Sequence, residues 1–315
     1  SKFPTSWPCF QPYLTKRTSS SNADSKIDYI CVKFMNLFGQ LMDLAEDSSI
    51  IMMLVSCTMA VAFILNIRAG STIFRNVVKA VENMRLKSRL DRQPSPINIA
   101  NEVIKRQLKL PLSWTNYKDL PMAVVLENNG STAILRIYTA PNLLPHLSGA
   151  DLGGSYHFVE AIFKWGILRS EHSIGRERFC LEMQALHRCP QKKGTSEYLT
   201  ISYLFVLTPF KNEPLTQIVD HLKWILRPGS SIELPPFDLG SLLRPFAGGH
   251  YIYHGTYDNG EVVLPTIWLI DSQITGVNSH QMAQFEVLRR KDGSRIWSNV
   301  REPQPLGSRT VLFHY

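Results

Sequence analysis

Charged side chains on and near one β-rich run are the first candidates for chemistry in this sequence. Lys164 follows Glu160 by four residues, so both would project from the same face of a β-strand. An ammonium and carboxylates that lie close together can transfer protons, and Lys164, Glu171 and Asp258 could form an acid/base cluster of this kind. The alternative is a structural ion network made of the same residues.

Motifs for other chemistries do not occur in the sequence. It has no CxxC pair, no GxSxG elbow and no phosphate-cradling glycine loop. His250 and His254 are four residues apart, but they lie near a turn and without a third partner that would complete a metal site. Five irregularly spaced cysteines indicate free thiols rather than a disulfide framework, although pairing of Cys180 with Cys189 stays open.

The positive charge of the chain is concentrated in one segment. The 315 residues carry a formal net charge of +8. Residues 70–110 hold 9 basic and 3 acidic residues, whereas residues 111–315 hold 19 basic and 18 acidic ones. The composition is that of a globular protein, and the even balance over the larger part disfavours a general nucleic-acid-binding surface.

A long uncharged run adjoins this basic segment. The 18 residues from Ile50 to Ile67 carry no charge, and a helix of about 18–20 such residues spans a bilayer core. We therefore expect a transmembrane helix over residues 49–68, with a buried core helix as the alternative. Acidic residues precede the run and basic residues follow it, so the positive-inside rule puts the C-terminal side in the cytosol or the mitochondrial matrix.

The segments around this expected span complete the domain organisation. Residues 1–26 are rich in Ser, Thr and Pro, which predicts a flexible tail or a targeting segment. Residues 27–47 have the apolar spacing of an amphipathic helix, which would lie on the membrane interface or against a partner subunit. Residues 69–87 form a basic juxtamembrane linker or helix, and residues 88–315 a folded domain.

The folded domain has the pattern of a mainly β protein. Short β-rich runs alternate with turn residues, and the best helical pattern covers only residues 215–226. The β-rich runs are Met122–Leu126, Thr132–Tyr138, Tyr156–Trp165, Phe179–His187, Tyr198–Thr208, Val262–Asp271 and Thr310–His314.

Several runs of the folded domain resemble segments of the α-class carbonic anhydrase family, in the same order and with similar spacing. They are PSPINI at 94–99, LENNG at 126–130, FVEAIFKWG at 158–166, SEH at 170–172, CLEMQALH at 180–187, the region from Tyr253 to Trp268, and NVREPQPLGSR at 299–309. The resemblance covers roughly residues 88–315. It implies a single α+β domain, mainly β, around a large twisted and mostly antiparallel sheet.

The resemblance also implies a reaction and a metal site, and the residues depart from that site. The family hydrates carbon dioxide on a zinc ion that is held by three histidines. These positions fall on Ile162, Lys164 and Gln184. An alkyl group has no lone pair, an ammonium only donates hydrogen bonds, and an amide is a poor zinc ligand. We therefore expect a pseudoenzyme that binds no zinc and uses no other cofactor.

Other positions of the family's site are partly lost and partly retained. The resemblance puts the proton-shuttle histidine at Ser131, which cannot titrate near neutral pH, and the pair that orients the zinc hydroxide at Asp258 and Asn259. The residues that surround and support the site in the family are retained at Trp165, Glu171, Glu182 and Trp268.

Lys164 could replace the charge of the missing zinc. A buried carboxylate without a cation is costly, so we expect Lys164 to pair with Glu160, Glu182 or Asp258, and Glu160 is the candidate on the same strand. The alternative is that Lys164 points into a wet cleft and pairs with nothing.

Three functions are consistent with these features. The first is a non-catalytic domain, anchored in a membrane, that acts as a structural or interaction subunit of a membrane protein complex. The second is an enzyme, either a residual carbon dioxide hydratase or one with an esterase-like activity. The third is a sensor that binds an anion at Lys164. The expected partners are a lipid bilayer and other membrane subunits, with no nucleic acid and no zinc. The identity of the membrane stays open.

Overall fold

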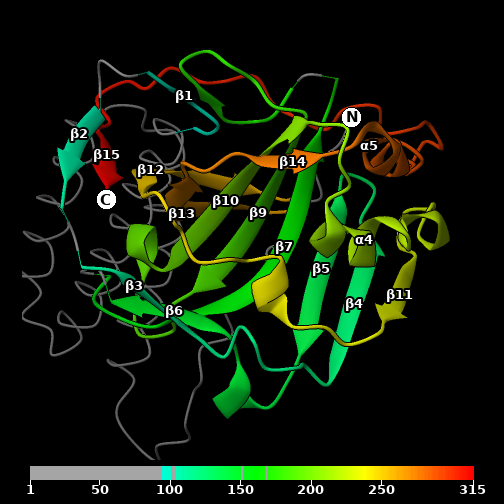
Figure 1. Cartoon of the computed structure of the whole chain (residues 1–315), viewed down its shortest axis with the longest axis horizontal. Helices are drawn as coiled ribbons and strands as arrows, with labels where there is room; N and C mark the ends of the chain where they lie inside the picture. Colours follow the sequence, from blue (N-terminus) through cyan, green and yellow to red (C-terminus); the bar gives the residue numbers. More distant parts are fainter. Residues whose placement is uncertain (1–93, 101–103, 109, 150–151, 168) are drawn as a thin grey trace, which may run out of the picture. The chain divides into compact units, whose positions relative to one another are not determined.

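Figure 1 shows the computed structural model, which describes residues 94–315 except 101–103, 109, 150–151 and 168. The expected tail, amphipathic helix, transmembrane helix and basic linker all lie outside the described residues. Within the described part of the chain, no helix has the length and apolar character needed to cross a membrane.

A single large sheet of 13 strands dominates the described residues. Its main path, from one edge to the other, is β11 (Ser231–Leu234), β4 (Ala123–Asn128), β5 (Ala133–Tyr138), β7 (Tyr156–Trp165), β9 (Leu181–Arg188), β10 (Tyr198–Leu207), β13 (Val263–Asp271), β12 (His250–Asp258), β15 (Val311–His314) and β2 (Ile104–Gln107). Figure 1 shows β11 and β2 at opposite edges of this sheet.

Three shorter strands complete the sheet, and two more form a separate pair. β14 (Thr275–Val277) pairs with β10, and β3 (Leu112–Thr115) pairs with β6 (His146–Gly149), which also pairs with β7. β1 (Asn98–Ile99) and β8 (Ser173–Ile174) form a parallel two-stranded sheet. In the large sheet, β10 is parallel to β13 and β14, and β15 is parallel to β2, while the other neighbours are antiparallel. The expected mainly β fold with a mostly antiparallel sheet is confirmed.

Helices are short where the structure describes the chain. α4 (Glu213–Val219) and α5 (Ser279–Phe285) are each capped by an asparagine, whose side chain accepts a hydrogen bond from a first-turn backbone N–H. The helix expected at 215–226 is too long, because α4 ends at Val219 and a separate 3₁₀ turn, η4 (Leu222–Trp224), follows. The 3₁₀ turns η2, η3 and η5 cover Pro141–Leu143, Gly194–Ser196 and Leu239–Ser241.

The central strand β7 contains a β-bulge that decides which side chains face the site. Along β9, Phe158 pairs with His187 and Glu160 with Leu186, so Val159 is an extra residue in β7. The side chain of Val159 is 39% exposed, whereas Phe158 and Glu160 are buried. An extra residue reverses the alternation of side chains beyond it.

The bulge keeps most apolar side chains of β7 on one face of the sheet. The larger core cluster receives Tyr156, Phe158, Ala161, Phe163 and Trp165 from this strand. The alternation after the bulge turns Glu160, Ile162 and Lys164 to the opposite face of the sheet. There Ile162 belongs to a smaller cluster that also contains Tyr257 and Trp268. The candidate site therefore lies on this second face.

Candidate functional site

The register of β7 and β9 brings the three expected zinc positions together. Ile162 lies directly opposite Gln184, and Lys164 lies opposite Glu182. Ile162, Gln184 and Glu182 have no exposed surface, and Lys164 is 5% exposed. The strand pairing that the resemblance implies is thus present, and these side chains form the centre of the candidate site.

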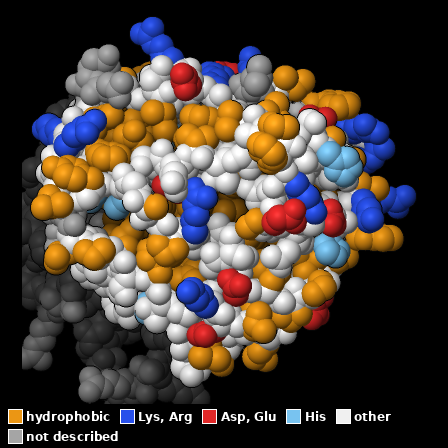
Figure 2. Space-filling model, in the orientation of Figure 1, with side chains coloured by type: hydrophobic (Ala, Val, Ile, Leu, Met, Phe, Trp, Pro, Cys, Tyr) orange, Lys and Arg blue, Asp and Glu red, His pale blue; other side chains and the backbone are white. Residues whose placement is uncertain are grey.

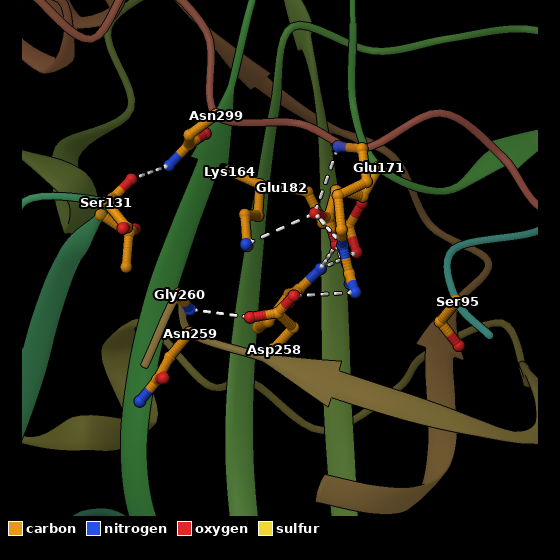
Figure 3. Close-up of polar contacts among 12 residues, drawn as sticks. Ser95, Ser131, Lys164, Glu171, Glu182, Asp258, Asn259, Gly260 and Asn299 are labelled. Atoms are coloured by element: carbon orange, nitrogen blue, oxygen red, sulfur yellow. Dashed lines mark hydrogen bonds and ion pairs between the residues drawn. The ribbon is translucent and has the colours of Figure 1, made fainter. Parts of the chain in front are cut away.

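Lys164 lies at one end of an ion network (Figure 3). The Nζ atom of Lys164 lies 3.4 Å from Oε1 of Glu171, a fully buried carboxylate that precedes β8. Arg301 donates to both oxygens of Glu171, with 2.9 Å from Nε to Oε1 and 2.8 Å from Nη2 to Oε2. The third nitrogen of this guanidinium, Nη1, lies 3.2 Å from Oδ2 of Asp258. Two cations therefore neutralise two carboxylates in one connected cluster.

The expected pair between Lys164 and Glu160 is wrong. Four residues along a β-strand correspond to about 13 Å, so two side chains on the same face can share that face without touching. Glu160 instead pairs with Arg136, whose Nη2 lies 2.9 Å from Glu160 Oε2. Its other oxygen, Oε1, accepts hydrogen bonds from the Tyr257 hydroxyl and from Asn259 Nδ2, both at 2.9 Å. Glu160 thus belongs to a second ion network.

The carboxylate of Glu182 pairs with His172 and not with Lys164. Its Oε1 lies 2.7 Å from Nδ1 of His172, and its Oε2 accepts the His172 backbone N–H at 2.8 Å. The chain of hydrogen bonds continues from His172 Nε2 to the Tyr253 hydroxyl at 2.6 Å, and from there to Ser95 Oγ at 2.8 Å. Trp268 donates its indole N–H to the same Ser95 oxygen at 3.1 Å. The residues retained at Glu182 and Trp268 therefore support the site together.

Gln184 joins the two carboxylates at the centre. Its Nε2 donates to Glu171 Oε2 at 3.1 Å and to Glu182 Oε1 at 2.8 Å. The amide oxygen of Gln184 is buried and has no hydrogen-bond partner among the described residues. The amide therefore presents its hydrogens to the acids, as a donor must.

The pKa values of the two central carboxyls are lowered by their cationic neighbours. Burial raises the pKa of Glu171, but the Lys164 charge and the Arg301 hydrogen bonds outweigh this and bring it from 4.5 to about 2. Burial also raises the pKa of Glu182, and the charge and hydrogen bonds of His172 outweigh it, so that this pKa lies below its ordinary value. The acids are therefore held in the charged form over the neutral range.

Two turns contact each other beside the site. One of them contains Ser131, the position that the resemblance assigns to the proton shuttle. The side chain of Asn129 donates from Nδ2 to the backbone oxygen of Asn259 at 2.8 Å, which joins the turn after β4 to the turn after β12. Gly260 has φ +89°, and a Cβ there would lie 2.4 Å from Cβ and Oγ of Ser131. Asp258 Oδ1 accepts the Gly260 backbone N–H at 2.8 Å. Ser131 therefore lies in a packed turn, and Asp258, the last residue of β12, holds the turn that follows it.

Trp165 lies away from the site. Its indole packs in the larger core cluster and donates to the Ile296 carbonyl at 2.8 Å. The expectation that Trp165 surrounds the site is wrong, because alternation along β7 turns it to the face opposite Lys164.

Arg301 and Arg136 are site residues that the sequence reasoning missed. Arg301 lies within NVREPQPLGSR, one of the runs that carries the family resemblance, so a signal for it was present. Arg136 lies on β5 and also contacts Glu127 of β4, and no motif marks it. Its role depends on the pairing of neighbouring strands.

Comparison with known proteins identifies the family of the described domain. The family model of eukaryotic-type carbonic anhydrase matches residues 82–315. Carbonic anhydrase 15 of Mus musculus is 27% identical over 238 residues, which are 69% of this chain and 74% of that relative. Carbonic anhydrase 1 of Oryctolagus cuniculus is 27% identical over 231 residues, which are 69% of this chain and 97% of that relative. Carbonic anhydrase 3 of Mus musculus is 24% identical over 230 residues, which are 69% of this chain and 87% of that relative.

The large β-sheet, with its buried polar centre on β7 and β9, defines a carbonic-anhydrase-like domain. The chain belongs to the eukaryotic-type carbonic anhydrase family.

The zinc ion that this family implies does not fit the side chains at the three positions that the sequence resemblance assigns to its ligands. Ile162 offers no donor atom, and the Lys164 ammonium would repel a dication. Gln184 directs its amide nitrogen to two carboxylates, which leaves a single neutral oxygen for a metal. These side chains therefore offer no set of donors for a zinc ion.

Proposed function

We propose that this chain is a non-catalytic member of its family that serves as a structural or interaction subunit of a membrane protein complex. The observation that supports this best is the ion pair of Lys164 with Glu171 at the centre of the domain, at 3.4 Å. An internal ammonium takes over the charge balance that a bound metal would otherwise supply.

The burial of the centre supports the same proposal. The side chains of Lys164 and Glu171 are 6% and 0% exposed. Ile162 of β7 and Gln184 of β9 are also fully buried. A hydratase needs a reactive water and a path for its proton, and no imidazole stands at Ser131 to carry that proton. A packed and charge-balanced centre is suited to holding a fold together.

Lys164, Glu171 and Asp258 belong to one ion network, and the electrostatics of this network favour a structural role over acid/base chemistry. Arg301 links Glu171 to Asp258, and Lys164 completes the group. A general base works best when its pKa lies near the working pH, whereas the pKa of Glu171 is about 2. The lowered pKa therefore favours an ion network over proton transfer.

An anion sensor at Lys164 is disfavoured by the neighbouring acids. Glu171 already pairs with Lys164, and its carboxylate shares Gln184 with Glu182. An added anion would have to displace a buried carboxylate and then lie beside another one.

The membrane part of the proposal depends on the sequence. The expected helix over 49–68, which contains the uncharged run Ile50–Ile67, would anchor the chain. The basic segment 69–87 would keep the folded domain on the cytosolic or matrix side. An anchored domain without catalysis is well suited to a subunit role, in which the fold offers surface to its partners.

Zinc content and carbon dioxide hydration of the purified full chain test the catalytic half of the proposal. We expect no stoichiometric zinc and no hydration above the uncatalysed rate. The matched control is the variant Ile162→His/Lys164→His/Gln184→His, which should acquire zinc because three imidazoles then meet across β7 and β9. Stoichiometric zinc and hydration by the unaltered chain would overturn the proposal.

Extraction of native membranes in mild detergent tests the other half. We expect the chain to remain in the membrane fraction after alkaline carbonate washing and to migrate with other subunits on a native gel. A chain that washes off the membrane and migrates alone would contradict the subunit role.

A further inference from the structure

A basic hollow lies at one corner of the described domain, away from the buried site. Its volume is about 650 Å³, and its lining consists of Arg227, Pro228, Arg289, Arg290, Lys291 and Gly293. Four of the six lining residues are therefore cations. In Figure 1 these segments lie at the side of the molecule that carries α5, and Figure 2 shows Lys and Arg side chains gathered at the same side.

Backbone pairing holds the two basic segments side by side. The backbone N–H of Arg289 donates to the Leu226 carbonyl at 3.0 Å, which sets the residues after η4 against the residues after α5. Asn128 donates from Nδ2 to the carbonyls of both Leu226 and Arg289, at 3.1 and 3.2 Å. The four cations thus project from a fixed framework and not from a free tail.

Two of the guanidinium groups are held in place by backbone oxygens. Nη1 of Arg289 donates to the Gly293 carbonyl at 2.8 Å, and Nη2 of Arg290 donates to the Ser298 carbonyl at 2.8 Å. Each arginine keeps further N–H groups for another acceptor. Gly130 permits the close packing beneath, since a Cβ there would lie 3.3 Å from both Lys291 Cγ and Pro228 Cβ.

The four cations form no close ion pair within the part of the chain that the structure describes. None of Arg227, Arg289, Arg290 and Lys291 forms an ion pair with a described residue. The nearby Asp292 is engaged in its own turn, where it accepts from the backbone N–H and the hydroxyl of Ser294 at 2.9 and 2.6 Å. The hydrogen bonds of Ser294 and the charge of Arg290 lower the pKa of Asp292, so one carboxylate offsets part of the positive charge. The remaining like charges repel one another, and a bound anion would reduce that cost.

We propose that this basic hollow is a binding site for phosphate groups. Guanidinium groups match the geometry of phosphate oxygens through paired N–H donors, and a lysine adds a point charge. Residues 111–315 carry 19 basic and 18 acidic residues, so this unpaired group of four departs from the balance of the domain. The volume suits a small phosphorylated molecule or a single lipid headgroup. The inference is independent of the proposed function, because the hollow shares no residue with the buried site.

Titration calorimetry on the full chain in a non-ionic detergent tests the site. The soluble probe is inorganic pyrophosphate, and the lipid probe is dioctanoyl phosphatidylinositol 4-phosphate against dioctanoyl phosphatidylcholine. The variant Arg227→Gln/Lys291→Gln removes two lining charges whose side chains make no hydrogen bond among the described residues. The matched control Lys118→Gln/Lys193→Gln removes two exposed charges outside the hollow.

Saturable binding should weaken by about tenfold or more in the hollow variant and stay unchanged in the control, since hydrogen bonds from charged donors are worth about tenfold in affinity. Tighter binding of pyrophosphate than of the lipid would identify a soluble ligand, and the reverse order would identify a headgroup; both support the site. An equal loss of affinity in the hollow variant and the control variant would overturn the proposal. So would an affinity that is unchanged in both variants. Matching urea midpoints of the variants would exclude unfolding as the cause of a loss.

Discussion

Replacing Lys164 with methionine should destabilise the fold through the carboxylate of Glu171. Methionine has a similar length and no charge, so the substitution removes the ion pair at 3.4 Å while it fills the space. Glu171 has no exposed surface, and water cannot take the place of the lost ammonium. Arg301 still holds Glu171 through two hydrogen bonds, which limits the loss.

The pKa of Glu171 sets the size of this effect. A shift from 4.5 to about 2 corresponds to about 3 kcal/mol of stability at neutral pH, at about 1.4 kcal/mol per pKa unit. Lys164 and Arg301 share this stabilisation, and Lys164 makes the larger single contribution that lowers the pKa. We therefore expect the free energy of unfolding to fall by about 2 kcal/mol in Lys164→Met at pH 7. This is less than the roughly 3–5 kcal/mol of a buried pair that loses its only partner, because Arg301 still holds Glu171.

The effect of the substitution should depend on pH in a defined direction. Because the folded pKa of Glu171 is depressed, its contribution is fully present above about pH 4.5 and is lost as the pH falls towards 2. Without Lys164 this carboxyl should protonate at a higher pH, so the difference between the two proteins should shrink from pH 7 to pH 3. Urea unfolding of the full chain in non-ionic detergent, followed by tryptophan fluorescence at several pH values, measures this difference.

A matched control separates burial from charge. Lys211 and Glu213 form an ion pair of the same length, 3.4 Å, but their side chains are 45% and 75% exposed. Lys211→Met should therefore change the stability by less than about 0.5 kcal/mol at every pH. Equal losses in the two variants, or a loss in Lys164→Met that does not vary with pH, would refute the reasoning.

Two other substitutions probe the packing around the site. Gly260→Ala should destabilise the fold by about 1–3 kcal/mol, because the new Cβ would overlap Ser131 and the residue has a positive φ. In chemical unfolding, the added change Ser131→Gly should recover only the part of the lost stability that is due to the overlap. If nothing is recovered, the loss comes from backbone strain alone. Tyr253→Phe should cost about 1–3 kcal/mol, since it leaves Nε2 of buried His172 without its hydroxyl partner. Tyr138→Phe, at a 55% exposed position, is the control for Tyr253, and similar midpoints for both would contradict this account.

The strands were predictable because short β-rich runs alternate with turn residues along the sequence. The run Tyr156–Trp165 is β7 without change, and the run Tyr198–Thr208 differs from β10 by one residue. Helical periodicity at 215–226 was less decisive. Leu215, Ile218, Leu222 and Ile225 are all buried, but a helix followed by a 3₁₀ turn buries them as well as one longer helix would.

The partners of the site residues were not predictable from spacing. Glu160 and Lys164 are close in sequence, yet about 13 Å of strand separates side chains four residues apart. The actual partner, Glu171, lies beyond the end of β7, and Arg301 joins it from 130 residues further along the chain. Ion pairing depends on the distance through space, which only the packed sheet defines.

The sequence alone determined the chemical identity of the centre, because Ile162, Lys164 and Gln184 occupy defined positions in runs that resemble one family. The tertiary structure decided what those side chains do. The bulge at Val159 selects which residues of β7 face the site, and the approach of Arg301 leaves Lys164 paired with Glu171. The sequence determines which side chains carry a charge, but the interaction energy of each charge depends on its burial and its neighbours.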